Sequence, residues 1–521
     1  MNRTIEDTGF ERSQVIGSPA FKKQSLLAAW RWWVPPALLA LTMALVFVDP
    51  FVGEWDALDY TILAVQGRPS SMILGRSLFI FANHALWRFA HALFTVPPEK
   101  AYLLFKYAVV VESPFTIIAW WWLARDLTDS ARVATLAVLL LALSPFYIIY
   151  SGQAMTEIPS LLLLAVALAI HLKGLRSKRA ALILVGAVLL GAGVNVREAA
   201  LLYAPWLVLA PLVCGWKLRR REITITALSC LVLLVCAFGP FVFLFWSNIN
   251  SYRLAWYGWV ESSRMESARH PVTIVNMLPL LRYFFIAAPL ALVAFPVAAF
   301  REWKRRGFSP LLTLATLGLI ANLSLIVHYS VVINGRYMLT GAPALAPLVA
   351  DYFERSQTRK NAPYAFASVV LGILFTAVIA GIYTWPFDRA YVVERALWKD
   401  YHARLALVPR DGVIIAGSQT VAVTYWRGIG SGEWDVIGTG AGWPGAQLAS
   451  VIETYMKEGR HVFLDADPRW WSLVGWQQQE IRELVGIESR FRFRRVSETI
   501  YEIRPQDDGT AHDLPNLSRL L

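Results

Sequence analysis

Acidic residues gather where the chain leaves its first long apolar run. The sequence GEWDALDY follows directly on the apolar run 33–48 and carries Glu54, Asp56 and Asp59. If this segment is helical, Asp56 and Asp59 share one face with Tyr60, because side chains three and four residues apart are neighbours. A carboxylate in such a group can accept a proton from an attacking hydroxyl or amide. Acids at this place can also cap a helix or simply face water.

Charged residues of both signs stand at the ends of later apolar segments. They are Glu157 in AMTEIPS, Arg197 and Glu198 in NVREAALL, and Arg336, with Tyr337 beside it, in INGRYML. The fork of an arginine side chain matches the oxygens of a phosphate. If these residues meet at one depth of a membrane, a phosphate carried on a lipid is a natural ligand. The alternative is that they only form salt bridges or reach towards the headgroups.

The composition is that of a membrane protein. Of 521 residues, 56% are hydrophobic and 17% are charged, and the mean hydropathy is +0.46. Soluble globular chains hold about 45–50% apolar residues. The formal net charge of +12 comes from short Lys and Arg clusters between apolar blocks, which is typical of cytoplasmic loops and argues against a nucleic-acid partner. The three cysteines fall in apolar blocks, so neither a disulfide framework nor a metal motif is predicted.

Apolar blocks of suitable length predict about eleven membrane spans. A helix that crosses a bilayer needs roughly 17–25 mostly apolar residues. If every basic cluster is cytoplasmic, the protein is a multi-pass protein of the plasma or inner membrane, residues 1–32 form a cytoplasmic N-terminal segment, and the C-terminus lies outside. The predicted spans are 33–48, 101–123, 133–149, 158–172, 180–194, 199–213, 223–246, 275–300, 311–327, 337–350 and 364–383.

Residues 72–94 are predicted to lie flat on the outer surface, within an outer loop that comprises residues 49–98. Their polar residues, which include Arg76 and His84, fall in one arc of about 140° around a helix, and the opposite side holds Leu, Phe and Ala. An amphipathic helix of this kind lies in the membrane interface. A spanning helix is the alternative, but it would place the basic cluster 125–132 outside.

Residues 386–521 are predicted to form a separate soluble α/β domain outside the membrane. Short runs rich in Val and Ile predict strands, and longer polar runs between them predict helices. No glycine-rich phosphate fingerprint follows these strands, and there is no nucleophile elbow. The predicted strands are 413–417, 434–438, 461–467 and two within 491–504, and the predicted helices are 446–459 and 476–486.

This order of motifs resembles the C-type fold of integral-membrane glycosyltransferases. The nearest resemblance is to the group of protein O-mannosyltransferases and lipid A aminoarabinose transferases. DALDY and the residues after it resemble the first outer loop of that group, VREAALL resembles an arginine-led span, and GRYMLTGAPALAPL resembles a late span that opens with Arg-Tyr. The resemblance covers residues 33–350. It implies a polytopic α-helical glycosyltransferase domain over residues 33–385, followed by the soluble α/β domain.

Two positions depart from the pattern of that group. Ala57 stands where the second acid of its Asp-Glu pair is found, so Asp59 takes that part or no residue does. The sequence LGRSLF stands in place of the Lys-Pro-Pro-Leu motif that meets the lipid phosphate, so Arg76 is the candidate for that work. Because of these departures, the resemblance does not specify the sugar or the acceptor, but it still implies the fold.

The resemblance implies an inverting transferase that moves a hexosyl or pentosyl group from a polyprenyl-phosphate carrier to a protein, lipid or glycan at the outer face. The acceptor attacks the anomeric carbon and displaces the lipid phosphate. In this mechanism Asp56 takes the acceptor's proton, and Asp59 and Glu157 are the other candidate catalytic acids. The implied phosphate-binding residues are Arg76, Arg197 and Arg336, with His84 in support, and the residues that position donor and acceptor are Tyr60, Glu198 and Tyr337.

No cofactor is implied, and no obligatory metal is expected. Asp56, Asp59 and Glu157 could hold a divalent cation through oxygen ligands, but no diagnostic spacing is present. A multi-span transporter or lipid flippase is the alternative function, because it would also have many spans and buried charge. The sequence lacks the two similar halves that transporters often have. A non-catalytic scaffold would leave the acids and arginines of the outer face unexplained.

Overall fold

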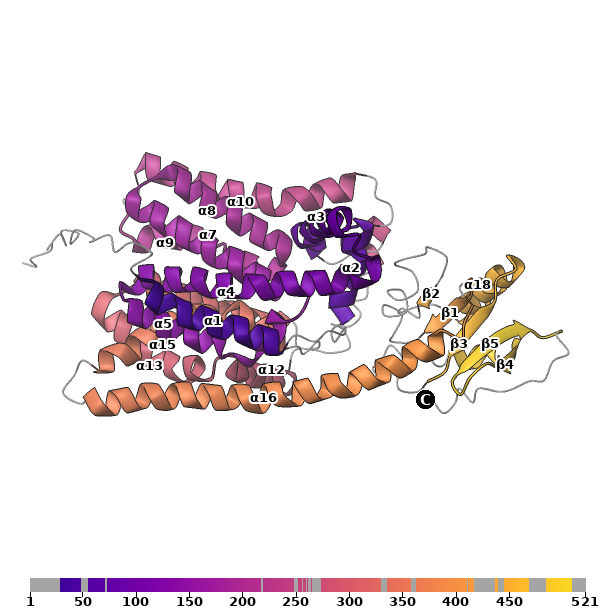
Figure 1. Ribbon diagram of the computed structural model, residues 1–521. Coiled ribbons are helices and arrows are strands. Elements are labelled where there is room, and N and C mark those ends of the chain that lie inside the picture. Colours follow the sequence, from indigo (N-terminus) through magenta and orange to yellow (C-terminus); the bar gives the residue numbers. More distant parts are fainter. Residues whose placement is uncertain are drawn as a thin grey trace, which may run out of the picture.

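The chain forms a bundle of long helices that is followed by a small β-sheet (Figure 1). This is the predicted order of elements. The computed structural model describes residues 29–47, 55–70, 73–216, 219–247, a few positions between 252 and 264, 273–328, 335–357, 362–409, 411–416, 436–438, 445–467 and 484–507. Glu54 lies outside these residues, as does most of the predicted helix 476–486.

Two groups of helices make up the bundle. In one group α4, α7, α8 and α10 pack one against the next, and in the other α15 packs against α5, α13 and α14. The helix α1 contacts both α4 and α5. The helices are α1 (Trp30–Val46), α4 (Ala101–Thr128), α5 (Ala131–Ala142), α6 (Pro145–Ser151), α7 (Glu157–Ser177), α8 (Ala180–Val196), α9 (Trp206–Val213), α10 (Arg220–Trp246), α12 (Ile274–Ala287), α13 (Pro289–Arg306), α14 (Pro310–His328), α15 (Ala342–Gln357) and α16 (Ala362–Leu405).

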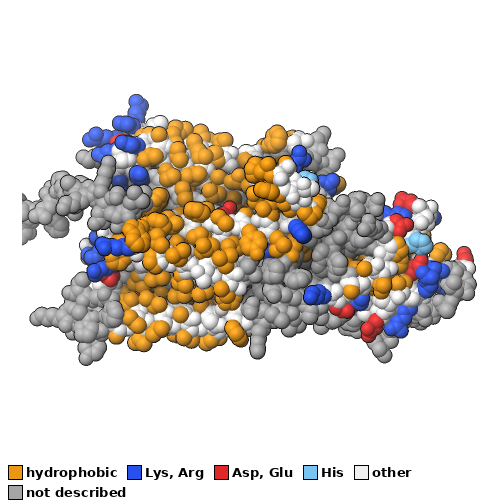
Figure 2. All heavy atoms as spheres, viewed as in Figure 1, with side chains coloured by type: hydrophobic (Ala, Val, Ile, Leu, Met, Phe, Trp, Pro, Cys, Tyr) orange, Lys and Arg blue, Asp and Glu red, His pale blue; other side chains and the backbone are white. Residues whose placement is uncertain are grey.

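The side of the bundle is a broad hydrophobic band, and Lys and Arg side chains gather at the end far from the sheet (Figure 2). Among the described residues, five helices are long and apolar enough to cross a membrane, or up to seven if each of two bent pairs is one span. The hydrophobic band and the basic end are the features expected of an integral membrane protein. The predicted number of about eleven spans stays a prediction.

Bent helix pairs replace two of the predicted continuous spans. The segment 133–149 contains α5 and α6, which meet at 69°, and the segment 275–300 contains α12 and α13, which meet at 88°. Pro145 and Pro289 each stand in the first turn of the second helix of the pair. Proline has no N–H to donate to the preceding turn, so it is tolerated where a helix begins but not where one continues.

Two other predicted spans begin with 3-10 turns. The turn η4 (Glu198–Tyr203) precedes α9, and the turn η5 (Gly335–Thr340) precedes α15. A short 3-10 turn has poorer hydrogen-bond geometry than an α-helix. Inside a membrane, irregular backbone of this kind is tolerated where protein groups or a water-filled cavity surround it.

The predicted flat segment contains the turn η2 (Ile73–Arg76) and the helix α3 (Ser77–Phe94). In Figure 1 the helix α3 is seen nearly end-on, so it lies across the direction of the long helices. It packs against α2 (Trp55–Gln66) and α8, and its other side exposes Phe89, Leu93 and Phe94. An apolar face on such a crosswise helix supports the predicted place in the membrane interface.

Glycines allow α8 to pack tightly on both of its neighbours. A Cβ atom at Gly186 would lie 2.7 Å from Cβ of His171 on α7, and one at Gly191 would lie 2.5 Å from Cβ of Cys236 on α10. Small residues at such contacts let membrane helices approach closely. Because Arg197 directly follows the last residue of α8, this packing fixes where that arginine stands.

The helix α16 is much longer than the predicted span 364–383 and ends at Leu405. Its 44 residues extend over about 66 Å at 1.5 Å per residue, whereas a bilayer core is about 30 Å thick. The helix runs along the bundle and continues beyond it to the sheet (Figure 1). Near its end Arg404 Nη2 lies 2.8 Å from Asp467 Oδ2, which fastens the helix to the sheet.

The C-terminal sheet has five strands in the order β2-β1-β3-β5-β4. β1 pairs in parallel with β2 and β3, while β5 pairs antiparallel with β3 and β4. The helix α18 (Gly445–Lys457) packs its apolar side on one face of the sheet. The strands are β1 (Val413–Ala416), β2 (Val436–Gly438), β3 (Val462–Asp465), β4 (Phe491–Arg495) and β5 (Ile500–Pro505), which lie where the sequence predicts them.

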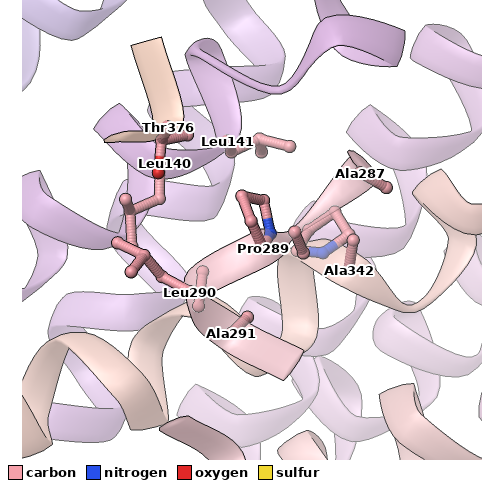
Figure 3. A pocket seen from close by; sticks show the side chains of 11 residues that line it. Leu140, Leu141, Ala287, Pro289, Leu290, Ala291, Ala342 and Thr376 are labelled. Atoms are coloured by element: carbon pink, nitrogen blue, oxygen red, sulfur yellow. The ribbon is translucent and has the colours of Figure 1, made fainter. Parts of the chain in front are cut away.

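An apolar pocket lies at the bend between α12 and α13 (Figure 3). Its wall contains Leu140 and Leu141 of α5, the bend residues 287–291, and residues of α15 and α16. Its one hydroxyl, on Thr376, donates a hydrogen bond to the Gly372 carbonyl of its own helix at 2.9 Å. The pocket offers no charged group to a ligand, so the chemistry must be sought elsewhere.

The predicted topology can be tested by labelling single cysteines in a variant without the three native cysteines. Ser489→Cys lies on the exposed surface of the sheet domain, and Ser177→Cys lies at the exposed last residue of α7. We expect an impermeant maleimide added to intact cells to label position 489 and to leave position 177 unlabelled until the cells are lysed. The reverse pattern would contradict the placement of the C-terminal domain outside.

Candidate active site

Asp56, Asp59 and Tyr60 lie on the helix α2, as the sequence predicts. The ring of Tyr60 is buried and meets Phe79 edge-on, with 5.7 Å between the ring centroids. On the same ring rests Arg76, whose Cζ lies 5.2 Å from the centroid. The packing of α2 on the start of α3 therefore brings Arg76 next to the two acids.

Two arginines from later parts of the chain share the carboxylate of Glu157, and one of them also reaches Asp56. Arg336, on η5, forms ion pairs with Asp56 of α2 and with Glu157, the first residue of α7. Its Nε lies 3.4 Å from Glu157 Oε1. Arg197, just before η4, pairs with the same Glu157. Glu157 thus pairs with two arginines, and Arg336 pairs with two carboxylates.

A further ion pair and an aromatic ring complete the group. Arg76 Nη2 lies 3.3 Å from Glu198 Oε1. The ring of Tyr337 faces both other arginines, with its centroid 4.8 Å from Arg197 Cζ and 5.4 Å from Arg336 Cζ. The ring can hold both guanidinium groups through cation–π contacts without neutralising them.

These side chains form one buried group, which we call the outer cluster: Asp56, Asp59, Arg76, Glu157, Arg197, Glu198 and Arg336. Arg76, Glu157 and Arg197 are each only 3% exposed. Every member takes part in an ion pair except Asp59, which makes no hydrogen bond or ion pair within the described residues. Buried charges are costly unless they are paired, so a cluster of this size points to a function.

A small pocket opens beside the outer cluster. One part of its wall is polar and includes Glu157, Arg197, Arg336 and Thr340, whereas the rest is made of Leu and Ala side chains. Nε and Nη2 of Arg197 are buried and have no hydrogen-bond partner in the described part of the chain. Guanidinium N–H groups that are free to donate, next to an apolar wall, suit an anionic oxygen on a hydrophobic chain.

The two acids of α2 have opposite electrostatic environments. Burial alone would raise the pKa of Asp56, but the Arg336 and Arg76 guanidinium groups hold the pKa of this carboxyl below its ordinary value. Burial, together with repulsion by Asp56, raises the pKa of Asp59 to about 7. A carboxylate with a pKa near the working pH is better matched to accepting a proton than one held strongly ionised.

The structure does not bring His84 into the outer cluster. Its Nδ1 bonds to the Ala64 carbonyl oxygen at 2.7 Å, and its ring packs near Trp87 and Gly67. These contacts join α3 to α2, which is the ordinary role of a polar residue on an amphipathic helix. The predicted support of the phosphate by His84 therefore lacks a contact in the described part of the chain.

Two buried polar residues near the site escaped the sequence analysis. Asn322 lies in the apolar stretch TLGLIANLSLIV, and Tyr203 lies in ALLYAPW. Both make hydrogen bonds to the backbone of η5. An asparagine in the middle of an apolar span is a signal in itself, because such residues usually face the protein interior.

The outer cluster does not fit a resident divalent cation. Ca²⁺ and Mg²⁺ need several free oxygen ligands around one point. Here Asp56, Glu157 and Glu198 each face an arginine. Among the described residues, no three His, Cys, Asp or Glu side chains are arranged to hold a metal ion.

Comparison with known proteins identifies the class of fold. The family model for dolichyl-phosphate-mannose-protein mannosyltransferase matches residues 82–243. No curated protein sequence matches the chain significantly. Nineteen chains of solved structures match it in fold. The chain has the C-type fold of integral-membrane glycosyltransferases, and the predicted resemblance is confirmed.

Three solved structures share this fold over most of the chain. ArnT from Cupriavidus metallidurans bound to undecaprenyl phosphate has a TM-score of 0.57 at 13% identity, over 91% of this chain and 98% of that one. The oligosaccharyltransferase AglB from Archaeoglobus fulgidus, with an inhibitory peptide and a dolichol-phosphate, has a TM-score of 0.55 at 14% identity, over 94% of this chain and 75% of that one. Another AglB structure, with Zn and sulfate, has a TM-score of 0.54 at 13% identity, over 91% of this chain and 73% of that one.

Proposed function

We propose that the chain is an inverting glycosyltransferase that moves a hexosyl or pentosyl group from a polyprenyl-phosphate carrier to an acceptor at the outer face of the membrane. The observation that carries this proposal is the outer cluster, in which distant segments bring arginines and acids to one buried pocket with an apolar wall. The comparison structures support it, since ArnT holds undecaprenyl phosphate and AglB holds dolichol-phosphate.

Arg197 and Arg336 are the proposed ligands of the donor phosphate, with Arg76 beside them. Arg197 has unpaired N–H groups at the pocket, and its neighbour Arg336 lines the same wall. Their charges favour the phosphate as it gains negative charge on leaving the sugar. The Leu and Ala side chains of the pocket wall would face the first part of the polyprenyl chain.

Asp59 is the proposed proton acceptor, and Asp56 is the proposed partner that holds Arg336. The acceptor oxygen or nitrogen attacks the anomeric carbon while its proton passes to Asp59. The bond between this carbon and the phosphate oxygen breaks, and its electron pair stays on the phosphate. The sequence predicts Asp56 as the base, but its ion pair with Arg336 and the lowered pKa favour Asp59.

The other predicted site residues take supporting parts in this proposal. Glu157 fixes the spacing of Arg197 and Arg336, and Glu198 fixes Arg76. Tyr60 and Tyr337 support the guanidinium groups with their rings. The acceptor is a protein, lipid or glycan that reaches the site from outside, where residues 386–521 would stand next to the opening of the membrane domain.

Release of polyprenyl phosphate by the purified protein tests this function. An undecaprenyl-phosphate sugar is incubated with the protein and a crude membrane extract as the source of acceptor. We expect the wild type to release undecaprenyl phosphate and Arg197→Gln to release it at least about 10²-fold more slowly. Arg494→Gln, which removes a surface arginine of the sheet, is the matched control. If the protein releases polyprenyl phosphate from none of the sugar donors, the alternative function, transport of the lipid, is tested in proteoliposomes.

A further inference from the structure

Two of the 3-10 turns in the membrane domain, η4 and η5, are linked to the positions of Arg197 and Arg336. Arg197 stands directly before η4, and Arg336 is the second residue of η5. Neither turn has the regular hydrogen bonds that fix side-chain directions along an α-helix. The position of Arg336 therefore depends on what holds the backbone of η5.

Asn322 of α14 holds η5 from one side. Its Nδ2 donates to the Met338 carbonyl oxygen at 3.1 Å, and its Oδ1 accepts from the Gly341 N–H at 2.8 Å. The side chain is fully buried. A carboxamide offers a donor and an acceptor side by side, so it satisfies both the Met338 carbonyl and the Gly341 N–H.

Tyr203 holds η5 from the other side and connects it to η4. Its hydroxyl donates to the Thr340 carbonyl oxygen at 2.7 Å. Tyr203 is the last residue of η4, and Thr340 is the last residue of η5. This hydrogen bond thus joins the segment that follows Arg197 to the segment that carries Arg336.

The backbone packs tightly beside Asn322. A Cβ atom at Gly341 would lie 2.0 Å from the Gly318 carbonyl oxygen and 2.7 Å from Oδ1 of Asn322. The backbone of α14 therefore lies directly against Gly341, the residue that follows η5. Within a membrane, an unpaired backbone N–H or C=O group is destabilising, because no water is present to form the missing hydrogen bond.

We infer that Asn322, together with Tyr203, is a positioning residue that sets Arg336 between Asp56 and Glu157 without touching the substrate. This inference rests on the proposed function. Loss of the Asn322 bonds would let η5 shift and move the guanidinium of Arg336 relative to the donor phosphate. A misplacement of about 1 Å in an active site can cost about 10²-fold in rate.

The expected results concern turnover more than donor affinity. Asn322→Leu keeps the size of the side chain but removes both hydrogen bonds, and we expect it to lower kcat by about 10–100-fold with little change in KM. Tyr203→Phe removes one hydrogen bond and should lower kcat by about 2–10-fold. Thr376→Val, which removes a buried hydroxyl bond in α16, is the matched control and should leave kcat unchanged.

A combination with Arg336→Lys separates positioning from general packing. If Asn322 acts through Arg336, Asn322→Leu adds little to the loss already caused by Arg336→Lys. A role in packing alone would multiply the two losses, and that result would overturn the inference. Tyr203→Phe goes through the same cycle, so the inference stays testable if Asn322→Leu does not fold.

The affinity of the purified protein for undecaprenyl phosphate separates this inference from the proposed function. If the wild type transfers no sugar, the proposed function fails, and the same cycle of variants is read from this affinity instead. A loss of affinity in the double variant that is smaller than the product of the two single losses would then support the coupling of Asn322 to Arg336. An Asn322→Leu protein that equals the Thr376→Val control in both readouts would overturn the inference.

Discussion

Asp59→Asn is expected to lower the turnover of sugar transfer by about 10²–10⁴-fold, the usual contribution of a positioned general base. The asparagine keeps the shape of the side chain but cannot accept the acceptor's proton. Asp59 is the only member of the outer cluster that makes no ion pair within the described residues, so its loss leaves the arginines held. The measurement is the rate of undecaprenyl phosphate release at saturating donor.

The pH profile decides whether Asp59 is the base. Because the pKa of Asp59 is raised to about 7, wild-type kcat/KM should rise with pH up to about 7 and level off above it. The rise should be absent in Asp59→Asn. In Asp56→Asn it should remain but move to lower pH, since the charge of Asp56 helps to raise the pKa of Asp59.

Asp56→Asn also serves as the contrasting variant. It should lower turnover by loosening Arg336 rather than by removing the base. If Asp59→Asn stays active while Asp56→Asn loses both turnover and the pH-dependent rise, Asp56 is the base, as the sequence predicts. Asp411→Asn, at an exposed acid before the sheet, is the control for a change of charge outside the site.

The charged residues of the outer cluster could be singled out from the sequence, but the ion pairs that join them could not. Glu157, Arg197 and Arg336 stand out because each interrupts an apolar segment near its end, where a charge is costly without a reason. Their partners depend on the fold. Arg336 meets Asp56, which lies 280 residues earlier, and Arg76 meets Glu198. No local pattern encodes contacts between segments so far apart.

The fold was predictable where composition decides it and less so where backbone geometry does. Hydropathy predicts α4, α7 and α10 as long apolar helices. Because it only averages apolar residues, it does not predict the breaks at Pro145 and Pro289. The end of α16 shows the opposite error. The polar residues after 383 suggest that the span ends there, but nothing in them ends a helix, and Pro386 is accommodated within it.

Hydrogen bonds between a side chain and the backbone are the part of the site that sequence reasoning misses most easily. Asn322 and Tyr203 carry no charge and belong to no catalytic pattern. Their importance depends on η5 being a 3-10 turn, which the apolar sequence 337–350 does not reveal. A polar residue becomes a positioning residue only once the irregular backbone it satisfies is known.

Arg336→Gln is expected to lower turnover by about 10²–10³-fold, the usual effect of removing one group that stabilises the transition-state charge. It should also reduce the free energy of unfolding by about 3–5 kcal/mol, because breaking a buried ion pair leaves the partner's charge uncompensated. Within the described residues, Asp56 loses its one ion-pair partner, whereas Glu157 keeps Arg197. The measurements are the release rate and thermal unfolding in detergent.

Combining Arg336→Gln with Asp56→Asn separates the two effects. The double variant no longer buries an unpaired carboxylate at position 56, so it should regain much of the stability that Arg336→Gln loses. It should regain none of the turnover, because the arginine charge at the phosphate is still missing. Arg404→Gln, which breaks the pair with Asp467 at the sheet, is the control and should lower stability but not turnover. Turnover that returns together with stability would mean that Arg336 only holds the fold, and the leaving phosphate would then rely on Arg197 and Arg76.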